Sequence, residues 1–382
     1  MNTNTIASQA RRWLPRFSLR TLLLCTLLIG SGTTLWGHCD AWNHALTFPG
    51  AHDKKLGTGD GYQTLATFSP DGSKLCHCGN STFPRVCDAA TGAELFAFTG
   101  QIDAVVSVRY SPDGRWIVSA GSDGLARLWN AHTGKEIRSF QGHKGAISYA
   151  TFSQDFAKII TAGSDATARI WNVSTGDEAR RLFEDFGELR DPGPMQCAAF
   201  GPGGKTVATI SVSRICFWDT TSGKQIVAIP TETSHFSCAF SPDGLKLLTG
   251  CWDGKARIWN ISDDGIMGVL SGHDPNKHIH TAEFMCDGEK IMTASCDNSV
   301  RVWDTVTSAE LASMKGQPDL ISASVSPDSK FIASASRDGT VWIWHRRRPE
   351  PWWGIAWLPE FWLTLIFAAA FAWSALRDRT AI

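Results

Sequence analysis

Residues Ser107–Gly142 read SVRYSPDGRWIVSAGSDGLARLWNAHTGKEIRSFQG, and this stretch decides the fold. Short apolar runs alternate in it with tight turns, which is typical of consecutive antiparallel strands. The predicted strands are 107–110, 116–120, 126–130 and 136–140. The turns between them are 112–114, 122–124 and 133–134, where proline presets φ and glycine accepts a positive φ. One such unit therefore forms a single four-stranded sheet.

The first turn of this unit recurs seven times along the chain. The copies are Phe68–Gly72, Tyr110–Gly114, Phe152–Phe156, Phe200–Gly204, Phe240–Gly244, Phe284–Gly288 and Val325–Ser329, at steps of 42, 42, 48, 40, 44 and 41 residues. A period near forty residues indicates a propeller or another repeat array. Such a ring is more often a binding surface than a reaction vessel.

The predicted third strands end in a common pattern. The endings are Trp129-Asn130, Trp171-Asn172, Trp218-Asp219, Trp259-Asn260, Trp303-Asp304 and Trp344-His345. Phrases such as AGSDGLARLWN and GCWDGKARIWN precede them, and over residues 43–345 the chain resembles the WD40 repeat family. Two repeats depart from the family pattern: Cys87-Asp88 stands at the Trp position of the first, and 211–214 of the fourth lacks the turn Asp.

The resemblance implies an all-β, seven-bladed WD40 β-propeller over 43–345. Its last repeat stops after a third strand, whereas residues 44–49 read like the outer strand of the other repeats. We therefore expect 44–49 to pair with 340–345 and to complete the last blade, which removes an exposed sheet edge.

The resemblance also implies a hydrogen-bonded tetrad within a blade, and two are complete by alignment. They are His143, Thr161, Asp165 and Trp171, and His273, Thr293, Asp297 and Trp303. A buried Asp needs partners, which a His and a hydroxyl supply. We interpret both tetrads as structural rather than as catalytic dyads, and Gln101 and Gln317, which replace the His in two other repeats, agree with a packing role.

Two apolar stretches flank the repeats. We expect a basic tail (1–18), a transmembrane helix or signal anchor (19–36), a basic linker (346–351), a transmembrane or interfacial helix (352–376) and a short tail (377–382). A cleaved signal peptide is the alternative for 19–36, because Gly30-Ser31-Gly32 offers small residues for cleavage.

Arginine counts set the expected topology. Four N-terminal arginines and Arg377 and Arg379 place both tails inside, so the propeller is expected outside the cytoplasm, at a bacterial inner membrane. Arg346, Arg347 and Arg348 oppose this, and a cytoplasmic propeller is the alternative. The triplet either contacts anionic lipid headgroups or is a solvated linker.

Two stretched loops are candidate sites for a protein partner. They contribute Glu184, Asp185, Glu188 and Asp191 from one loop, and Lys277, His278 and His280 from the other. The competing interpretation is a tolerated surface insertion. His278 and His280 with the nearby His273 also suggest a metal ion, but His273 already has a tetrad role, so we expect no metal site.

Composition narrows the class of function. A formal net charge of −1 argues against nucleic acid as a partner. The eleven cysteines have no zinc-like spacing and read as small buried residues, with a disulfide among Cys76, Cys78 and Cys87 as the alternative. No phosphate loop, nucleophile elbow or cofactor motif is present. We expect a membrane-anchored, non-catalytic scaffold that contacts protein and lipid; an enzyme or small-molecule sensor with a site in the central channel is the alternative.

Overall fold

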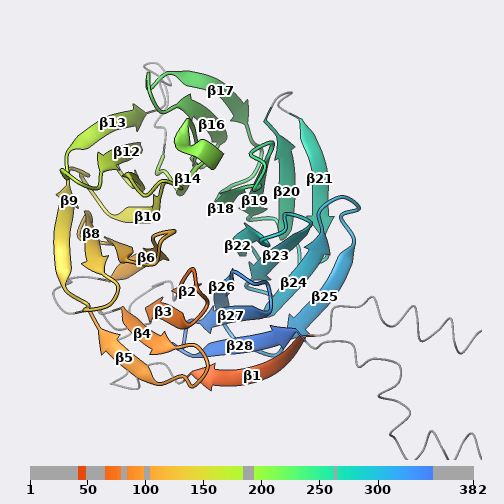
Figure 1. Cartoon of the computed structure of the whole chain (residues 1–382). Helices are drawn as coiled ribbons and strands as arrows, with labels where there is room; N and C mark the ends of the chain where they lie inside the picture. Colours follow the sequence, from red (N-terminus) through yellow and green to blue (C-terminus); the bar gives the residue numbers. More distant parts are fainter. Residues whose placement is uncertain are drawn as a thin grey trace, which may run out of the picture. The chain divides into compact units, whose positions relative to one another are not determined.

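Seven four-stranded sheets form the blades of a ring in the computed structural model (Figure 1). The structure describes residues 42–48, 65–78, 84–98, 104–183, 193–261 and 265–346. All of them belong to one unit, Trp42–Arg346. In every blade neighbouring strands run antiparallel, and in blades 1 to 6 they follow one another along the chain from the ring centre outward, so each of these repeat units makes one sheet (Figure 1).

The blades follow the chain order. Blade 1 has β2 (Leu65–Phe68), β3 (Lys74–Cys78), β4 (Arg85–Asp88) and β5 (Glu94–Ala97). Blade 2 has β6 (Val105–Tyr110), β7 (Trp116–Gly121), β8 (Leu125–Asn130) and β9 (Glu136–Gln141). Blade 3 has β10 (Ile147–Phe152), β11 (Lys158–Gly163), β12 (Thr167–Asn172) and β13 (Glu178–Phe183). Blade 4 has β14 (Cys197–Phe200), the short 3₁₀ turn η2 (Pro202–Gly204), β15 (Thr206–Ile210), β16 (Arg214–Asp219) and β17 (Gln225–Pro230).

The remaining blades repeat the arrangement. Blade 5 has β18 (His235–Phe240), β19 (Lys246–Cys251), β20 (Lys255–Asn260) and β21 (Ile266–Ser271). Blade 6 has β22 (Ile279–Phe284), β23 (Lys290–Ser295), β24 (Ser299–Asp304) and β25 (Glu310–Lys315). Blade 7 has β26 (Leu320–Val325), β27 (Phe331–Ser336), β28 (Val341–Arg346) and β1 (Trp42–Phe48).

The seventh blade takes its outer strand from the other end of the sequence. β1 pairs antiparallel with β28, and Figure 1 shows the two side by side. The register begins with Trp42 opposite Arg346 and ends with Phe48 opposite Val341. These pairs correspond to the expected pairing of 44–49 with 340–345. The chain therefore enters and leaves the ring at two residues that are paired with each other, Trp42 and Arg346.

Neighbouring blades bury their apolar faces against each other. Between blades 2 and 3, for example, Val118, Leu128 and Phe140 pack with Ile147 and Trp171, and all five are at most 2% exposed. Burying each such side chain is worth about 1.5–3 kcal/mol. The ring is therefore held by a series of similar interfaces between blades.

The recurrent first turns are fixed by local hydrogen bonds. In blade 2 the Ser111 hydroxyl donates to Asp113 Oδ1 at 2.6 Å, and Ser111 Oγ accepts the backbone N–H of Trp116 at 3.0 Å. Gly114 has a φ of +72°, a conformation that side chains with a Cβ resist. The Ser-Pro-Asp-Gly phrase is thus a turn whose every position has a conformational or bonding role.

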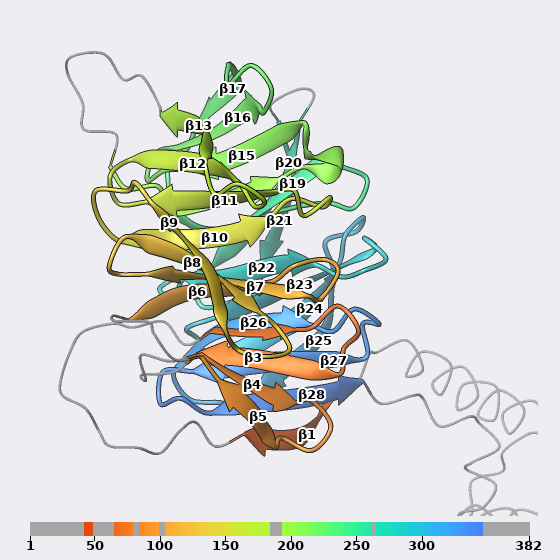
Figure 2. The ribbon, with the colours of Figure 1, turned by 60° about the vertical axis from the view of Figure 1, so that its left-hand side comes forward.

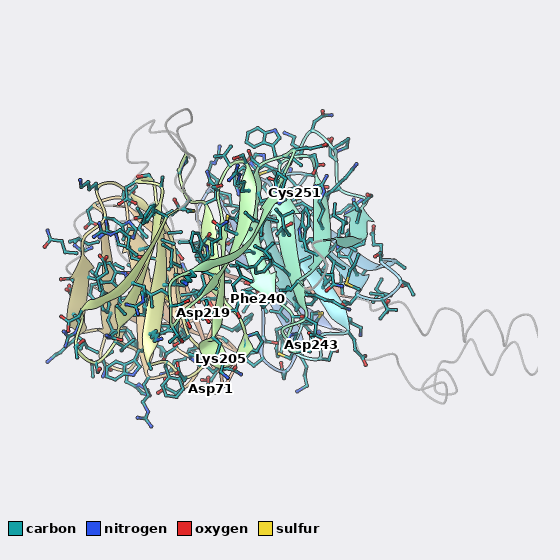
Figure 3. All side chains as sticks on the ribbon, turned by 90° about the horizontal axis from the view of Figure 1, so that it is seen from above. Asp71, Lys205, Asp219, Phe240, Asp243 and Cys251 are labelled. Atoms are coloured by element: carbon teal, nitrogen blue, oxygen red, sulfur yellow. The ribbon has the colours of Figure 1, made fainter. Side chains whose placement is uncertain are left out.

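The ring has two faces, which we name by their loops. The top face carries the loops that lead into inner strands and the turns between second and third strands; the bottom face carries the other turns (Figure 2). In Figure 3, Cys251 at the end of β19 lies toward one side, and Asp71, Lys205 and Asp243 lie toward the other.

The flanking segments predicted to contact the membrane lie outside the described residues. This applies to 19–36 and 352–376, to most of the basic linker 346–351 and to both tails. Within the part of the chain that the structure describes, no helix has the length and apolar character needed to cross a membrane.

Candidate functional site

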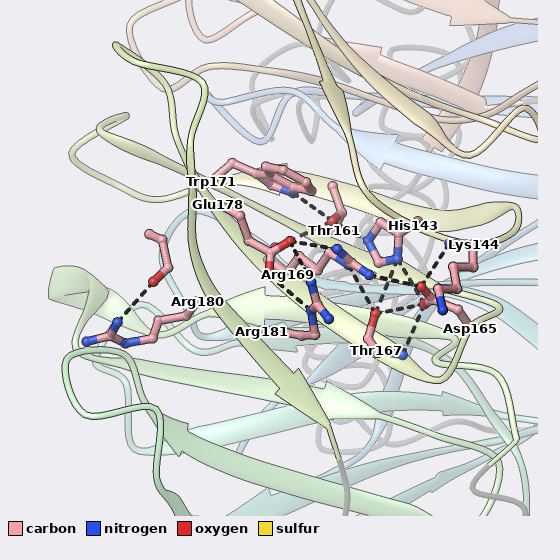
Figure 4. Close-up of polar contacts among 11 residues, drawn as sticks. His143, Lys144, Thr161, Asp165, Thr167, Arg169, Trp171, Glu178, Arg180 and Arg181 are labelled. Atoms are coloured by element: carbon pink, nitrogen blue, oxygen red, sulfur yellow. Dashed lines mark hydrogen bonds and ion pairs between the residues drawn. The ribbon is translucent and has the colours of Figure 1, made fainter.

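The structure brings the members of each predicted tetrad together. In blade 3, His143 Nδ1 lies 2.9 Å from Asp165 Oδ1, and His143 Nε2 lies 2.7 Å from Thr161 Oγ1. The Trp171 indole N–H donates to the same hydroxyl at 2.9 Å (Figure 4). In blade 6 the corresponding separations from His273 are 2.8 Å to Asp297 and 2.7 Å to Thr293.

Each tetrad carboxylate is saturated with donors. Asp165 also accepts the backbone N–H of Lys144 at 3.0 Å and the Thr167 hydroxyl at 2.7 Å. Burial raises the pKa of the Asp165 carboxyl, but the bonds from His143, Lys144 and Thr167 outweigh it and hold the pKa well below its usual value. Burial lowers the pKa of His143. The hydrogen bonds that Asp165 accepts from these protein donors are those of a carboxylate with a structural role.

The same indole contact recurs in the other Trp-bearing blades. The indole donates to a hydroxyl of the second strand in Trp129–Ser119, Trp218–Thr209, Trp259–Thr249, Trp303–Thr293 and Trp344–Ser334. Gln317 replaces the tetrad His of blade 7, and its side-chain amide donates to the backbone carbonyls of Ser334 and Thr340. Gln101 lies outside the described residues.

Blade 1 substitutes a different pair at these positions. Cys87 stands where the other blades have Trp, and its Sγ lies 3.5 Å from His77 Nε2. Burial lowers the pKa of His77 to about 4. All nine cysteines in the described residues are free thiols, including Cys76, Cys78 and Cys87.

An ion pair between two distant blades lies in the central channel. Arg109 and Glu283 occupy the fifth position of β6 and of β22, and Arg109 Nη2 lies 3.3 Å from Glu283 Oε1. The Arg109 guanidinium also lies 5.6 Å from the centre of the Tyr149 ring. Burial raises the pKa of Glu283, and the Arg109 charge opposes this. These three residues line a cavity of about 200 Å³.

Inner-strand bulges shape the mouth of this channel on the top face. In five inner strands the register shifts at the second residue, and the residues concerned are Val106, Ser148, Phe236, His280 and Ile321. A bulge re-aims a side chain and often lies beside a functional site. Four of these residues line the channel cavity: Val106, Ser148, Phe236 and His280. The same repeat position therefore contributes a different type of side chain to the cavity wall in each of these blades.

Blades 5 and 6 place aromatic and imidazole rings together at this mouth. We call Phe236, Trp252, His278, His280 and Cys296 the ring cluster. Trp252 is stacked on His278 with centroids 4.9 Å apart and planes at 19°, and Phe236 lies 5.0 Å from His278 and 5.2 Å from His280. The two imidazoles are 4.5 Å apart and nearly perpendicular. Trp252 remains 58% exposed, which is unusual for so large an apolar side chain.

Burial favours the neutral forms of the titratable groups in the ring cluster. Burial, His278 and Arg337 together lower the pKa of His280 to about 3, and burial with Lys277 and Arg337 lowers that of His278. Burial raises the pKa of the Cys296 thiol, while the Arg337 and Lys277 charges oppose this. Within the described residues the His280 imidazole has no hydrogen-bond partner.

The predicted partner-binding residues have different outcomes. Lys277 and His278 lie on the top face between β21 and β22, His280 is the second residue of β22, and Lys277 is exposed. Glu184, Asp185, Glu188 and Asp191, and likewise Arg347 and Arg348, lie outside the described residues; for Arg346 only the backbone is described. Sequence reasoning missed Trp252, Phe236 and Cys296. Trp252 and Cys296 stand at the repeat position that holds Ser122, Ser164 and Arg337 in other blades. An alignment of the repeats would have shown that this top-face position varies in chemistry.

Comparisons with known proteins agree with this geometry. A family model described as "WD domain, G-beta repeat" matches residues 92–130, 134–172, 227–260, 265–304 and 309–345. The third strands without a match belong to blades 1 and 4, the two repeats that depart from the sequence pattern.

Curated relatives are partial and distant. U4/U6 small nuclear ribonucleoprotein Prp4 of Homo sapiens is 38% identical over 39 residues, 10% of this chain and 8% of that protein. Autophagy-related protein 16 of Arabidopsis thaliana is 24% identical over 135 residues, 34% of this chain and 26% of that protein. Cilia- and flagella-associated protein 52 of Chlamydomonas reinhardtii is 23% identical over 159 residues, 41% of this chain and 26% of that protein. The chain thus spans about a quarter or less of the length of these relatives. The five matched repeats and the seven blades show that the chain contains WD40 repeats, arranged as a seven-bladed β-propeller.

Proposed function

We propose that this protein is a membrane-anchored, non-catalytic scaffold that binds a protein partner through the top face of blades 5 and 6. The observation that carries the proposal is Trp252, which is 58% exposed and stacked at 4.9 Å on His278. Exposed aromatic side chains held rigid by neighbours are the usual centres of protein interfaces, because they bury much area at little entropic cost. Lys277 at the edge of the cluster supplies a polar rim.

The central channel is the weaker candidate for a small-molecule site. Its cavity of about 200 Å³ is below the roughly 300–1,000 Å³ of typical ligand pockets. Its two charged side chains, Arg109 and Glu283, already neutralise each other. An enzyme or sensor of this kind would need those groups to be free for a ligand, so a scaffold is favoured.

The membrane anchor in this proposal comes from the sequence. Apolar residues 19–36 and 352–376 flank the ring, and Trp42 and Arg346, from which the chain continues toward both stretches, are paired neighbours. We place the propeller on the extracytoplasmic side of a bacterial inner membrane, with Arg346–Arg348 near lipid headgroups. Extraction of the membrane fraction with alkaline carbonate tests the anchor: release of the full chain into the supernatant contradicts it. Labelling of the exposed Cys286 thiol by an impermeant reagent in intact spheroplasts tests the side.

The partner proposal is tested by quantitative affinity capture with the full chain. Trp252→Ala is compared with Leu245→Ala, which is 64% exposed but lies in the bottom-face turn of the same blade. We expect Trp252→Ala to reduce the recovery of a specific protein by about tenfold or more, the effect of losing a hot spot. Leu245→Ala should leave recovery unchanged. Equal recovery with both variants would refute a top-face site on blade 5.

A further inference from the structure

Three side chains of the ring cluster carry atoms that bind transition metals. The ligand atoms of His278, His280 and Cys296 all lie within 4.8 Å of one another. The Cys296 Sγ to His278 Nε2 distance is 3.4 Å. A tetrahedral zinc ion with Zn–N of about 2.05 Å and Zn–S of about 2.3 Å separates two such ligands by about 3.6 Å. The nitrogen and sulfur therefore already have the spacing that a shared ion requires.

The fold holds these three residues independently of any ion. His278 and Cys296 are joined through the backbone, since the Cys296 N–H donates to the His278 carbonyl at 3.1 Å. Ile279 opposite Ser295 pins the adjoining strands, and the bulge between Ile279 and Thr281 sets the direction of His280. Ligands that are placed by strand pairing lose little freedom on binding, which is the arrangement of a preorganised site.

Aromatic walls fix the two imidazoles. Trp252 lies nearly parallel to the His278 ring, and Phe236 contacts both rings at 5.0 and 5.2 Å. The imidazole planes of His278 and His280 meet at 84° with centroids 4.5 Å apart. Within the described residues no protein group occupies the His280 nitrogens, so a half-buried ring faces the cluster with its lone pair unused.

We propose that His278, His280 and Cys296 bind one thiophilic or borderline transition-metal ion, with Zn²⁺ as the representative. Two imidazoles and a thiolate suit such an ion, whereas Mg²⁺ and Ca²⁺ require oxygen ligands. Binding replaces the thiol proton of Cys296, which leaves as H⁺, and forms one metal–sulfur and two metal–nitrogen bonds. Three protein ligands leave the fourth tetrahedral position to water or to a side chain of another molecule. This site does not depend on the proposed scaffold role.

The first test uses Co²⁺ as a spectroscopic probe on the purified full chain, kept reduced without added thiol. We expect one Co²⁺ per chain, a sulfur-to-cobalt charge-transfer band, and displacement by Zn²⁺. Cys296→Ala and His280→Gln should weaken binding by more than the roughly 10–100-fold that loss of an outer-shell partner costs. Cys286→Ala, which removes the exposed cysteine in the bottom-face turn of the same blade, should retain it. A missing band, or a band that survives Cys296→Ala, overturns the proposal.

A second measurement on the unchanged protein avoids any question of whether a variant folds. Cys286 and Cys296 are alkylated with and without Zn²⁺ and quantified by mass spectrometry. We expect Zn²⁺ to slow modification of Cys296 at least tenfold and to leave that of Cys286 unchanged. Equal rates at Cys296 with and without Zn²⁺ would show that the cluster is an aromatic packing feature and not a metal site.

Discussion

Replacing Asp165 by Ala should destabilise the propeller more than any change at an exposed turn. The His143 side chain is fully buried and the Asp165 side chain is only 9% exposed. The substitution deprives His143, Lys144 and Thr167 of their common acceptor and leaves Arg169 without one of its two carboxylate partners. The buried His143 imidazole then lacks its acceptor and the buried Arg169 keeps only Glu178, so we expect a loss of about 3–5 kcal/mol from a buried donor left unpaired and a weakened buried charge.

The assay is urea unfolding of the full chain followed by tryptophan fluorescence. At about 2–4 °C per kcal/mol for large domains, the melting temperature should also fall by on the order of 10 °C. The matched control is Asp243→Ala, since Asp243 lies in an exposed turn and accepts bonds from its close neighbours Ser241 and the Leu245 N–H; it should cost about 1 kcal/mol.

A double-mutant cycle separates the tetrad from general damage. His143→Ala and Asp165→Ala act on one network, so the double variant should be clearly less destabilised than the sum of the singles. If Asp165→Ala costs no more than Asp243→Ala, or if the two tetrad changes add, the tetrad does not stabilise blade 3 as argued.

Three further outcomes follow from the geometry. Burial lowers the folded-state pKa of His77 and of His235 to about 4, so each residue contributes stability that is present above the unfolded pKa of about 6.5 and is lost as the pH falls from there toward 4. Each contribution is on the order of 3 kcal/mol. Urea unfolding of His235→Gln should therefore show a weaker pH dependence over that range than the wild type or a His132→Gln control. Replacing 42–48 by a Gly-Ser linker exposes the edge of β28, and light scattering should detect concentration-dependent self-association that the intact ring does not show; a monomer of unchanged stability would contradict the closure argument. Arg109→Met leaves Glu283 unpaired in the channel and should cost several kcal/mol in thermal unfolding, whereas Arg109→Met with Glu283→Gln should recover most of the loss; equal stability of the single and double variants would count against the ion pair.

Much of the propeller could be predicted because its determinants are local. Each Ser-Pro-Asp-Gly turn makes its own hydrogen bonds, and the Trp ending each third strand meets a hydroxyl that a fixed spacing places opposite it. The pairing of β1 with β28 was also predictable, since a last blade without an outer strand and an N-terminal segment that resembles one imply each other.

The ring cluster could not be predicted because it depends on register and on neighbouring blades. A spacing of two residues in a regular strand predicts that the side chains of His278 and His280 lie on the same side, but the bulge in β22 changes the direction of the His280 side chain. Cys296 is 16 residues beyond His280 and reaches it through the turn between β23 and β24. Likewise Arg109 and Glu283 are 174 residues apart, and only closure of the ring brings them to 3.3 Å.

Closure by β1 also makes the order of synthesis matter. β1 ends at residue 48 and its partner β28 begins at residue 341, so on the ribosome the first strand of the ring is made long before the strand it needs. At about 5–20 residues per second, the interval is roughly 15–60 s. During that time six blades can form in sequence while β1 waits with both edges unpaired. A nascent chain released before residue 346 would lack the complete pairing of β28 with β1 inside blade 7, so this pairing is a single late step that quality control during synthesis would inspect.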